Sequence, residues 1–324
     1  MNPGCVDRMG EFKRWLIALV APPLHSVIGG RSNGTFGILT YHRIVARPPG
    51  LSQPTWNVTP ARFRSQLEGL LRRGYRPRPL GEVIECRRRN RPVPDKTFVV
   101  TFDDGYENVY LNAWPILKEL RVPATVFLAT AYLDGDRPFP FDDWPATGSD
   151  RAPASSWRPL STGQCAEMLD DGLIELGSHT HTHADFRGLP GVFRRDLLES
   201  LDVLRSRFGL ENVPFAFPFG VRSLGFAGDD LTEAARAVGV PCALTCEWEP
   251  VGPRSDPLQW GRFTVVPSDT GATLAAKLDG WYRRGGDAWR RLKQSFGAGG
   301  KSENAEQGHR EEQRLHVGQK GVGG

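Results

Sequence analysis

Two short stretches of this chain carry side chains that can bind a metal ion and move a proton. Residues 101–105 (TFDDG) hold two adjacent carboxylates, Asp103 and Asp104, and residues 177–183 (GSHTHTH) hold imidazoles at alternate positions. Two or three imidazoles and a carboxylate, with one position open to water, are the usual ligands of a catalytic zinc ion. Such an ion lowers the pKa of its bound water toward neutrality. The residue types therefore indicate metal-assisted hydrolysis with a carboxylate base beside the metal.

Each polar stretch follows a segment that has the composition of a buried strand. Residues 97–102 are β-branched and aromatic without polar alternation, which is typical of a strand buried on both faces in a parallel sheet. Residues 173–177 form a second such segment. Ligands of α/β proteins bind beyond the carboxyl ends of the strands, so both stretches are expected at one edge. Asp-Asp-Gly alone is often a turn, and histidines alone can be a solvated loop, but their conjunction favours a site.

The rest of the chain alternates expected strands and helices. This alternation implies a parallel sheet or a barrel, and the pattern itself does not choose between them. A helix from residue 60 has Thr59 as its expected N-cap and Pro60 at its first position. Further strands are expected at residues 37–43, 124–128, 241–245 and 262–266, and further helices at 108–120, 164–171, 193–208, 231–238 and 273–294.

The two polar stretches give the chain a resemblance to a known family. Residues 35–268 resemble a polysaccharide deacetylase of the NodB-like type, carbohydrate esterase family four. Residues 101–105 match the first family motif at every position, and His179-Thr180 followed by His183 matches the second. The resemblance implies an α/β fold, a distorted (β/α) barrel of about seven β/α units forming a single catalytic domain.

The resemblance also assigns roles to the residues of these two motifs. It implies that Asp104, His179 and His183 bind a divalent metal, with zinc the first choice among the first-row metals. Asp103 would be the general base. His181 lies between the outer histidines and would stay outside the ligand set as a solvent-facing or supporting imidazole.

The third family motif is altered in this chain. The family shows Arg-x-Pro followed by an aromatic and a small residue, whereas residues 215–220 read FAFPFG, with Ala216 in place of the arginine. The Pro-aromatic-Gly turn remains, and the backbone N–H of Phe219 is the expected donor to the developing oxyanion. In the family this arginine assists in orienting the general base, so the altered motif leaves the orienting of Asp103 open.

The last family motif, a Leu-x-His whose histidine protonates the leaving amine, is missing. Of the seven histidines, His25 lies in the N-terminal segment and His309 and His316 lie in a polar tail. His42 follows the first expected strand, and its Tyr-His-Arg context resembles the start of deacetylases acting on poly-N-acetylglucosamine, where a histidine here serves as the acid. A structural histidine bonded to a neighbouring strand is an equal alternative.

Composition is that of a soluble globular enzyme. The chain has 324 residues, of which 39% are hydrophobic and 24% charged. The net charge is only +4, and the basic run at residues 87–91 is typical of a solvated helix end or loop, so no nucleic-acid partner is expected. The five cysteines are odd in number and irregular in spacing, which implies no disulfide framework and favours a reducing compartment.

The ends of the chain lie outside the expected catalytic domain. We expect an N-terminal helical extension at residues 1–34, the deacetylase domain at 35–268, a helix at 269–295 and a disordered tail at 296–324. Residues 15–24 resemble a signal sequence, but two prolines interrupt them and they are too short to span a bilayer. A packed or membrane-surface helix fits equally, so a cytoplasmic or membrane-peripheral location is expected.

A long Pro-, Asp-, Ser- and Trp-rich segment at residues 134–160 interrupts the alternation. Long loops of this kind are usually functional or mobile. It carries Phe141, Trp144 and Trp157, which either stack on sugar rings or anchor the loop on the barrel.

The function predicted from these observations is metal-dependent removal of N-acetyl groups from an N-acetylated glycan. Two alternatives remain open at this point. A related amide hydrolase acting on a small non-sugar substrate would use the same metal chemistry. A catalytically impaired glycan-binding module would explain the missing arginine and the missing final histidine. The sequence names neither the glycan nor the oligomeric state.

Overall fold

The structure is a computed structural model that describes residues 34–46, 54, 56–142 and 152–281. The predictions made for the N-terminal segment, for the tail from residue 296 and for Trp144 fall outside these residues. No helix in the described ranges is long and apolar enough to cross a lipid bilayer.

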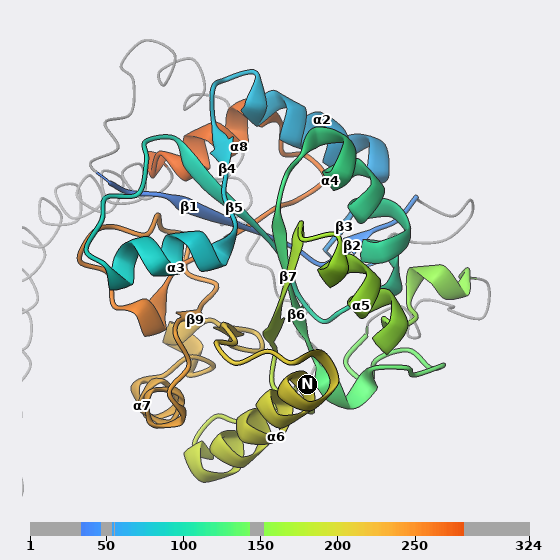
Figure 1. The fold of residues 1–324 in the computed structure, drawn as a ribbon, viewed down its shortest axis with the longest axis vertical. Coiled ribbons are helices and arrows are strands. Elements are labelled where there is room, and N and C mark those ends of the chain that lie inside the picture. Colours follow the sequence, from blue (N-terminus) through green and yellow to red (C-terminus); the bar gives the residue numbers. More distant parts are fainter. Residues whose placement is uncertain (1–33, 47–53, 55, 143–151, 282–324) are drawn as a thin grey trace, which may run out of the picture. The chain divides into compact units, whose positions relative to one another are not determined.

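The centre of the described chain is a curled, all-parallel sheet surrounded by helices (Figure 1). The strand order is β10-β1-β5-β6-β7-β8-β9, and β4 pairs with the start of β5 outside this path. A separate parallel pair joins β2 (Arg43–Ile44) and β3 (Asn57–Val58). The strands of the large sheet are β1 (Gly37–Tyr41), β4 (Arg76–Pro77), β5 (Thr97–Phe102), β6 (Ala124–Leu128), β7 (Ile174–Ser178), β8 (Phe215–Ala216), β9 (Ala243–Leu244) and β10 (Phe263–Thr264).

The two ends of this strand path approach each other. Trp260, just before β10, forms a parallel bridge with Leu244 of β9. The backbone N–H of Trp260 donates to the carbonyl of Ala243 at 3.1 Å, and the backbone carbonyl of Trp260 accepts from the N–H of Thr245 at 2.8 Å. The sheet therefore curls back on itself, which confirms the expected distorted (β/α) barrel.

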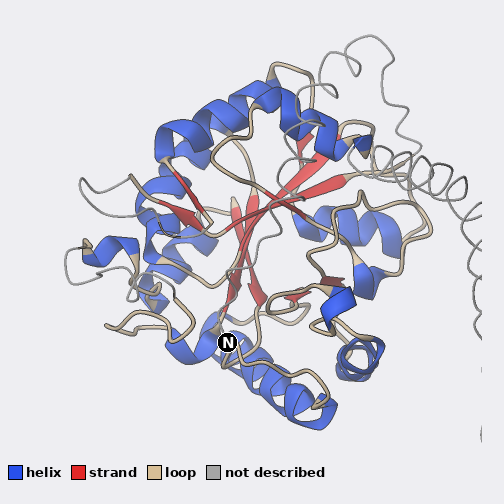
Figure 2. Cartoon of the chain, turned by 180° about the vertical axis from the view of Figure 1, so that it is seen from behind, coloured by secondary structure: helices blue, strands red, loops and turns tan. Residues whose placement is uncertain are grey.

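Helices cover the outside of the sheet (Figure 2). The side-chain oxygen of Thr59 caps the first of them by accepting from the N–H of Arg62, with Pro60 in the first turn as expected. Among the described residues, the α-helices are α2 (Pro60–Leu71), α3 (Leu80–Arg88), α4 (Trp114–Leu120), α5 (Thr162–Asp170), α6 (Pro190–Phe208), α7 (Asp229–Val238) and α8 (Gly271–Leu278). Short helical turns are η1 (Val109–Ala113), η2 (Thr130–Tyr132), η5 (Ala154–Ser156), η6 (Arg222–Leu224) and η7 (Pro257–Gln259).

Several elements differ from the expected ones in extent. The helix expected at residues 108–120 is interrupted by a π-helical turn, η1, before α4, because Pro115 has no N–H for an α-helical bond to Leu111. The strands expected at 241–245 and 262–266 are each two residues long. The helix expected at 273–294 is interrupted after Leu278, where Gly280 has a φ of +74°, a common helix stop, and Trp281, the last described residue, is again helical.

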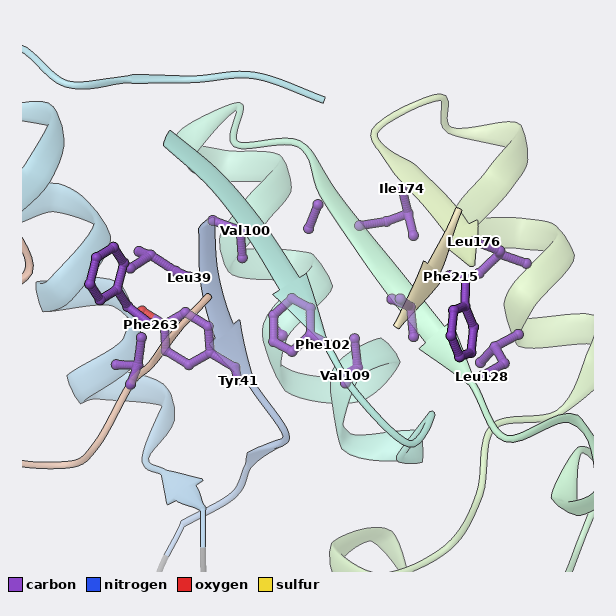
Figure 3. Packing of buried hydrophobic residues seen from close by; sticks show 14 of the residues in the cluster. Leu39, Tyr41, Val100, Phe102, Val109, Leu128, Ile174, Leu176, Phe215 and Phe263 are labelled. Carbon is purple, nitrogen blue, oxygen red and sulfur yellow. The ribbon is translucent and has the colours of Figure 1, made fainter. Parts of the chain in front are cut away.

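Alternate residues of the strands enter two separate hydrophobic clusters. Val100 and Phe102 belong to the larger cluster, which packs under the outer helices (Figure 3). Val99, between them, joins Ile38 of β1 and Phe127 of β6 in the other cluster. The strands are therefore buried on both faces, as the absence of polar alternation in β5 indicates. The side chain of Val99, and those of the residues two positions before and after it along β5, face the inside of the barrel.

Candidate metal-binding and catalytic site

The register between β1 and β5 places His42 beside Asp103. Thr40 pairs with Thr101 in this register, and the ladder continues because the Asp103 N–H donates to the Tyr41 carbonyl at 3.0 Å. His42 lies two residues after Thr40, and Asp103 lies two residues after Thr101. Both side chains therefore point to the inner face of the barrel. Their side chains meet, with His42 Nε2 3.9 Å from Asp103 Oδ2.

Asp104, His179 and His183 come together at the same edge of the sheet. One candidate ligand atom from each lies within 4.8 Å of the others. The Nε2 atoms of His179 and His183 are 3.6 Å and 3.4 Å from Asp104 Oδ1. All three side chains are buried. The structure thus brings together the three residues to which the family resemblance assigns the metal.

The donor set of this group suits a divalent metal ion. Nδ1 of His179 lies 2.8 Å from the carbonyl oxygen of Ala216. A proton on Nδ1, donated to this carbonyl, leaves the lone pair of Nε2 directed toward Asp104. Burial lowers the pKa of both His179 and His183, so both rings are neutral, the form that binds metals. Two imidazole nitrogens and one carboxylate fit zinc and other first-row metals.

The backbone around these side chains is held in an uncommon conformation. Asp104, Thr180 and His183 have φ angles of +71°, +66° and +54°. The side-chain oxygen of Thr180 accepts from the N–H of His183 at 3.0 Å. Asp196 of α6 accepts from the N–H of residues 181 and 182 at 2.6 and 3.1 Å. Such strain persists only where surrounding contacts enforce it, and it gathers at functional sites.

His181 points away from the metal-binding group. Its Nδ1 lies 2.9 Å from Thr130 Oγ1, and its Nε2 lies 3.4 Å from a carboxylate oxygen of Glu199 on α6. This position agrees with the expected place of His181 outside the ligand set.

Arg262 is the site residue that sequence reasoning missed. It directly precedes β10, and its guanidinium pairs bidentately with Asp103, at 2.6 Å for Nη1–Oδ1 and 2.9 Å for Nη2–Oδ2. Both side chains are buried. Arg262 also donates to the carbonyl of Thr245 at 3.2 Å. The altered third motif left open how Asp103 is oriented, and in the structure Arg262 makes this contact from a different part of the chain than Ala216.

The two adjacent aspartates have opposite pKa shifts. Burial alone would raise the pKa of Asp103, but the charges of Arg262, His179 and His42, with the hydrogen bonds from Arg262, together outweigh it and hold that pKa well below its usual range. Burial, and then the charge of Asp103, raise the pKa of Asp104 well above its usual range. Asp103 is therefore an ionised carboxylate at neutral pH. Asp104 is a carboxyl group whose charge a bound cation would stabilise.

His42 is neutral at neutral pH in this environment. Burial lowers its pKa to about 4, and the charges of Arg262, His179 and Arg43 act in the same direction, against the opposing effect of Asp103. Its Nδ1 is buried and has no hydrogen-bond partner among the described residues. A structural histidine would form a hydrogen bond to a neighbouring strand, and among the described residues Nδ1 of His42 forms none.

The turn after β8 brings Phe219 to the edge of the metal-binding group. Its ring centroid lies 4.9 Å from that of His183, and its φ is +60°. The next residue, Gly220, is tied to the following segment because its carbonyl accepts from the N–H of Cys246 at 2.8 Å. The N–H of Phe219 has no acceptor within the described part of the chain, so it is free to donate to a substrate.

The segment before residue 143 anchors on the barrel through its aromatic and charged residues. Phe141 stacks on His183, with centroids 3.9 Å apart. Asp142 forms a buried ion pair with Arg43 at 2.7 Å, and the hydroxyl of Tyr106 donates to Asp142 at 3.2 Å. Phe141 thus covers the imidazole of His183, in agreement with the anchoring alternative.

Comparison with known proteins agrees with this geometry. Residues 90–243 match the family model described as polysaccharide deacetylase. The resemblance to polysaccharide deacetylases stated from the motifs is confirmed. His42 and Arg262 both lie outside the matched range.

The chain is similar to a curated N-deacetylase and to several solved structures. It is 26% identical over 262 residues to a poly-beta-1,6-N-acetyl-D-glucosamine N-deacetylase of Staphylococcus epidermidis, a match that covers 75% of this chain and 83% of the relative. Two solved structures share the fold with a TM-score of 0.62 each. The deacetylase PplD of Streptococcus pyogenes is 22% identical, covering 75% of this chain and 98% of that one. IcaB of Ammonifex degensii is 23% identical, covering 74% and 96%.

Proposed function

We propose that this protein is a metal-dependent hydrolase that removes N-acetyl groups from a poly-N-acetylglucosamine glycan. The observation that carries the proposal is the pairing of a buried Asp103, kept ionised by Arg262, with the adjacent Asp104, His179 and His183 group. A base and a metal-binding group side by side are what hydrolysis of an unactivated amide needs. The substrate class follows from the similarity to the staphylococcal N-deacetylase.

Asp104, His179 and His183 would hold the metal ion, which when bound supplies a Lewis acid that polarises the acetyl carbonyl and activates water. Asp103 takes the proton from the attacking water. Its low pKa makes it fully ionised at neutral pH, and its bidentate pairing with Arg262 fixes the direction in which its oxygens point. The backbone N–H of Phe219 donates to the oxygen on which negative charge develops.

His42 donates the proton that the leaving amine requires. Its Nε2 is 3.9 Å from Asp103 Oδ2, so the base and the acid lie at adjoining positions on the inner face. Because the pKa of His42 is about 4, the resting imidazole is neutral at neutral pH. The proton it donates therefore has to reach it during turnover, and Asp103 is the neighbouring group that gains one.

The alternative function, a catalytically impaired glycan-binding module, is less well supported once the structure is considered. That hypothesis depended on the absence of the arginine of the third family motif and of the histidine of the last one. Arg262 contacts Asp103 in place of the first, and His42 lies beside Asp103 in place of the second.

Acetate release from defined oligosaccharides tests the proposal. The zinc-loaded protein should release acetate from a β-1,6-linked N-acetylglucosamine pentamer faster than from the β-1,4-linked pentamer. Acetate from small non-sugar amides alone would instead favour the amide hydrolase. Binding of the pentamer without acetate release would favour the binding module. Asp104→Ala, which removes a carboxylate of the metal-binding group, is the inactive control.

A further inference from the structure

Trp56 is an exposed aromatic residue at the edge of the site. Its side chain is 47% exposed, although a tryptophan is usually well covered. Its indole stacks on the imidazole of His42, with centroids 5.9 Å apart and planes inclined by 24°. One part of the indole thus contacts the proposed acid, and about half of the side chain remains open to solvent.

The backbone holds Trp56 in this position at an energetic cost. Its φ is +57°, a conformation that is strained for a bulky residue. The next residue, Asn57, fixes it, because its side chain accepts from the Val45 N–H at 3.1 Å and donates to the Val45 carbonyl at 3.0 Å. The Trp56 carbonyl also accepts from the N–H of Arg43, the neighbour of His42. The strain and the exposure together indicate a role other than packing.

The other aromatic rings near the site are more heavily engaged than Trp56. Phe141 is stacked on both His183 and Phe139. Phe219 lies against His183 and Phe226. Trp56 contacts the ring of His42, and in the described part of the chain no further ring contact of Trp56 is found.

An open aromatic face beside a catalytic group is suited to a sugar ring. In a β-linked N-acetylglucosamine the large substituents are equatorial, so each face of the pyranose presents apolar C–H groups. Such a face packs on an indole, burying apolar area while the hydroxyls stay in water. A small amide or ester has no comparable face.

We propose that Trp56 is a sugar-binding residue whose open indole face stacks on a pyranose of the glycan next to His42. This inference rests on the proposed function and deepens it. Trp56 sets the preference of the site for a glycan over a small acetylated compound, and it holds one ring of the polymer beside the reacting N-acetyl group.

Equilibrium binding tests this role separately from turnover. In an Asp103→Asn background, which should bind substrate without consuming it, the β-1,6-linked pentamer is titrated and followed by calorimetry. Trp56→Ala should weaken the Kd by about 3- to 10-fold, the effect of one aromatic contact, and Trp56→Phe should recover most of it. Leu198→Ala, which removes another exposed apolar side chain, should leave Kd unchanged.

Kinetics of the zinc-loaded enzyme distinguish sugar stacking from simple support of His42. In Trp56→Ala, kcat/KM for the pentamer relative to that for N-methylacetamide, a small amide that needs the same acid but has no sugar face, should fall by about 3- to 10-fold, mostly through KM. Equal losses on both substrates, or an unchanged Kd, would overturn the stacking role even if the enzyme deacetylates the glycan. Pentamer binding that depends on Trp56 without any acetate release would support the stacking role and refute the proposed activity. No binding by the parent protein would overturn both.

Discussion

Removal of Arg262 should affect both the stability of the fold and the acidity of the catalytic base. The pair with Asp103 is buried and bidentate, with contacts of 2.6 and 2.9 Å. Arg262→Met keeps a side chain of similar length without the charge. It leaves Asp103 as an uncompensated carboxylate in the barrel interior, where burial alone raises its pKa.

The expected loss of stability follows from this burial. Removing one partner of a buried ion pair costs about 3–5 kcal/mol, because the other charge stays desolvated. Adding Asp103→Asn to Arg262→Met removes that charge. The double variant should therefore be more stable than the sum of the single effects predicts, by roughly 2 kcal/mol. Arg236, paired with Asp256 at 2.8 Å on the surface, gives a matched control, and Arg236→Met should change stability little.

Urea unfolding at pH 7 with a chelator present measures these differences without a contribution from metal binding. The folded-state pKa of Asp103 lies below its unfolded value of about 3.9. The contribution of the pair is therefore complete at pH 7 and is lost as the pH falls below that value. In Arg262→Met the pKa of Asp103 rises, so the acid limb of the pH–rate profile should move to higher pH. Additive effects in the double variant, or an unmoved acid limb, would refute the role given to Arg262.

Three further predictions concern individual site residues. His179→Ala should abolish metal binding as measured by elemental analysis, whereas His181→Ala should keep about one ion per chain. Full metal content in His179→Ala would refute the ligand assignment. Asp103→Asn should retain the metal but lower turnover by about 10²–10⁴, the usual contribution of a general base; loss of the metal would make Asp103 a ligand. His42→Ala should slow hydrolysis of an N-acetyl substrate by about 10²–10⁴. It should slow an O-acetyl ester much less, because an alkoxide leaves more easily than an amine anion, and equal losses would make His42 structural.

Much of the site could be predicted because short motifs sit at the ends of strongly apolar strands. Thr97–Phe102 is the strand expected, and it delivers Asp103 and Asp104 to the edge where His179 and His183 arrive from β7. The position of His42 also followed from its place after an apolar strand. Its proximity to Asp103 then depends on the β1–β5 register, which no local pattern specifies.

Arg262 escaped prediction because it belongs to no contiguous motif. In the sequence it only begins the apolar run RFTVV, and a lone arginine at a strand end is usually solvated. One signal was present, since an arginine entering a buried strand needs a buried carboxylate as its partner. The interruption of the helix at 108–120 had a clearer signal in Pro115, whose missing N–H rules out a continuous α-helical ladder.

The dependence of acetate release on bound metal tests the central claim most directly. Chelated protein is titrated with zinc while acetate from the β-1,6-linked N-acetylglucosamine pentamer is measured. Activity should be absent without metal, rise in proportion to the zinc added, and reach its maximum near one ion per chain, with no recovery in His179→Ala. Full activity in metal-free protein, or no acetate from the pentamer at saturating metal, would contradict it.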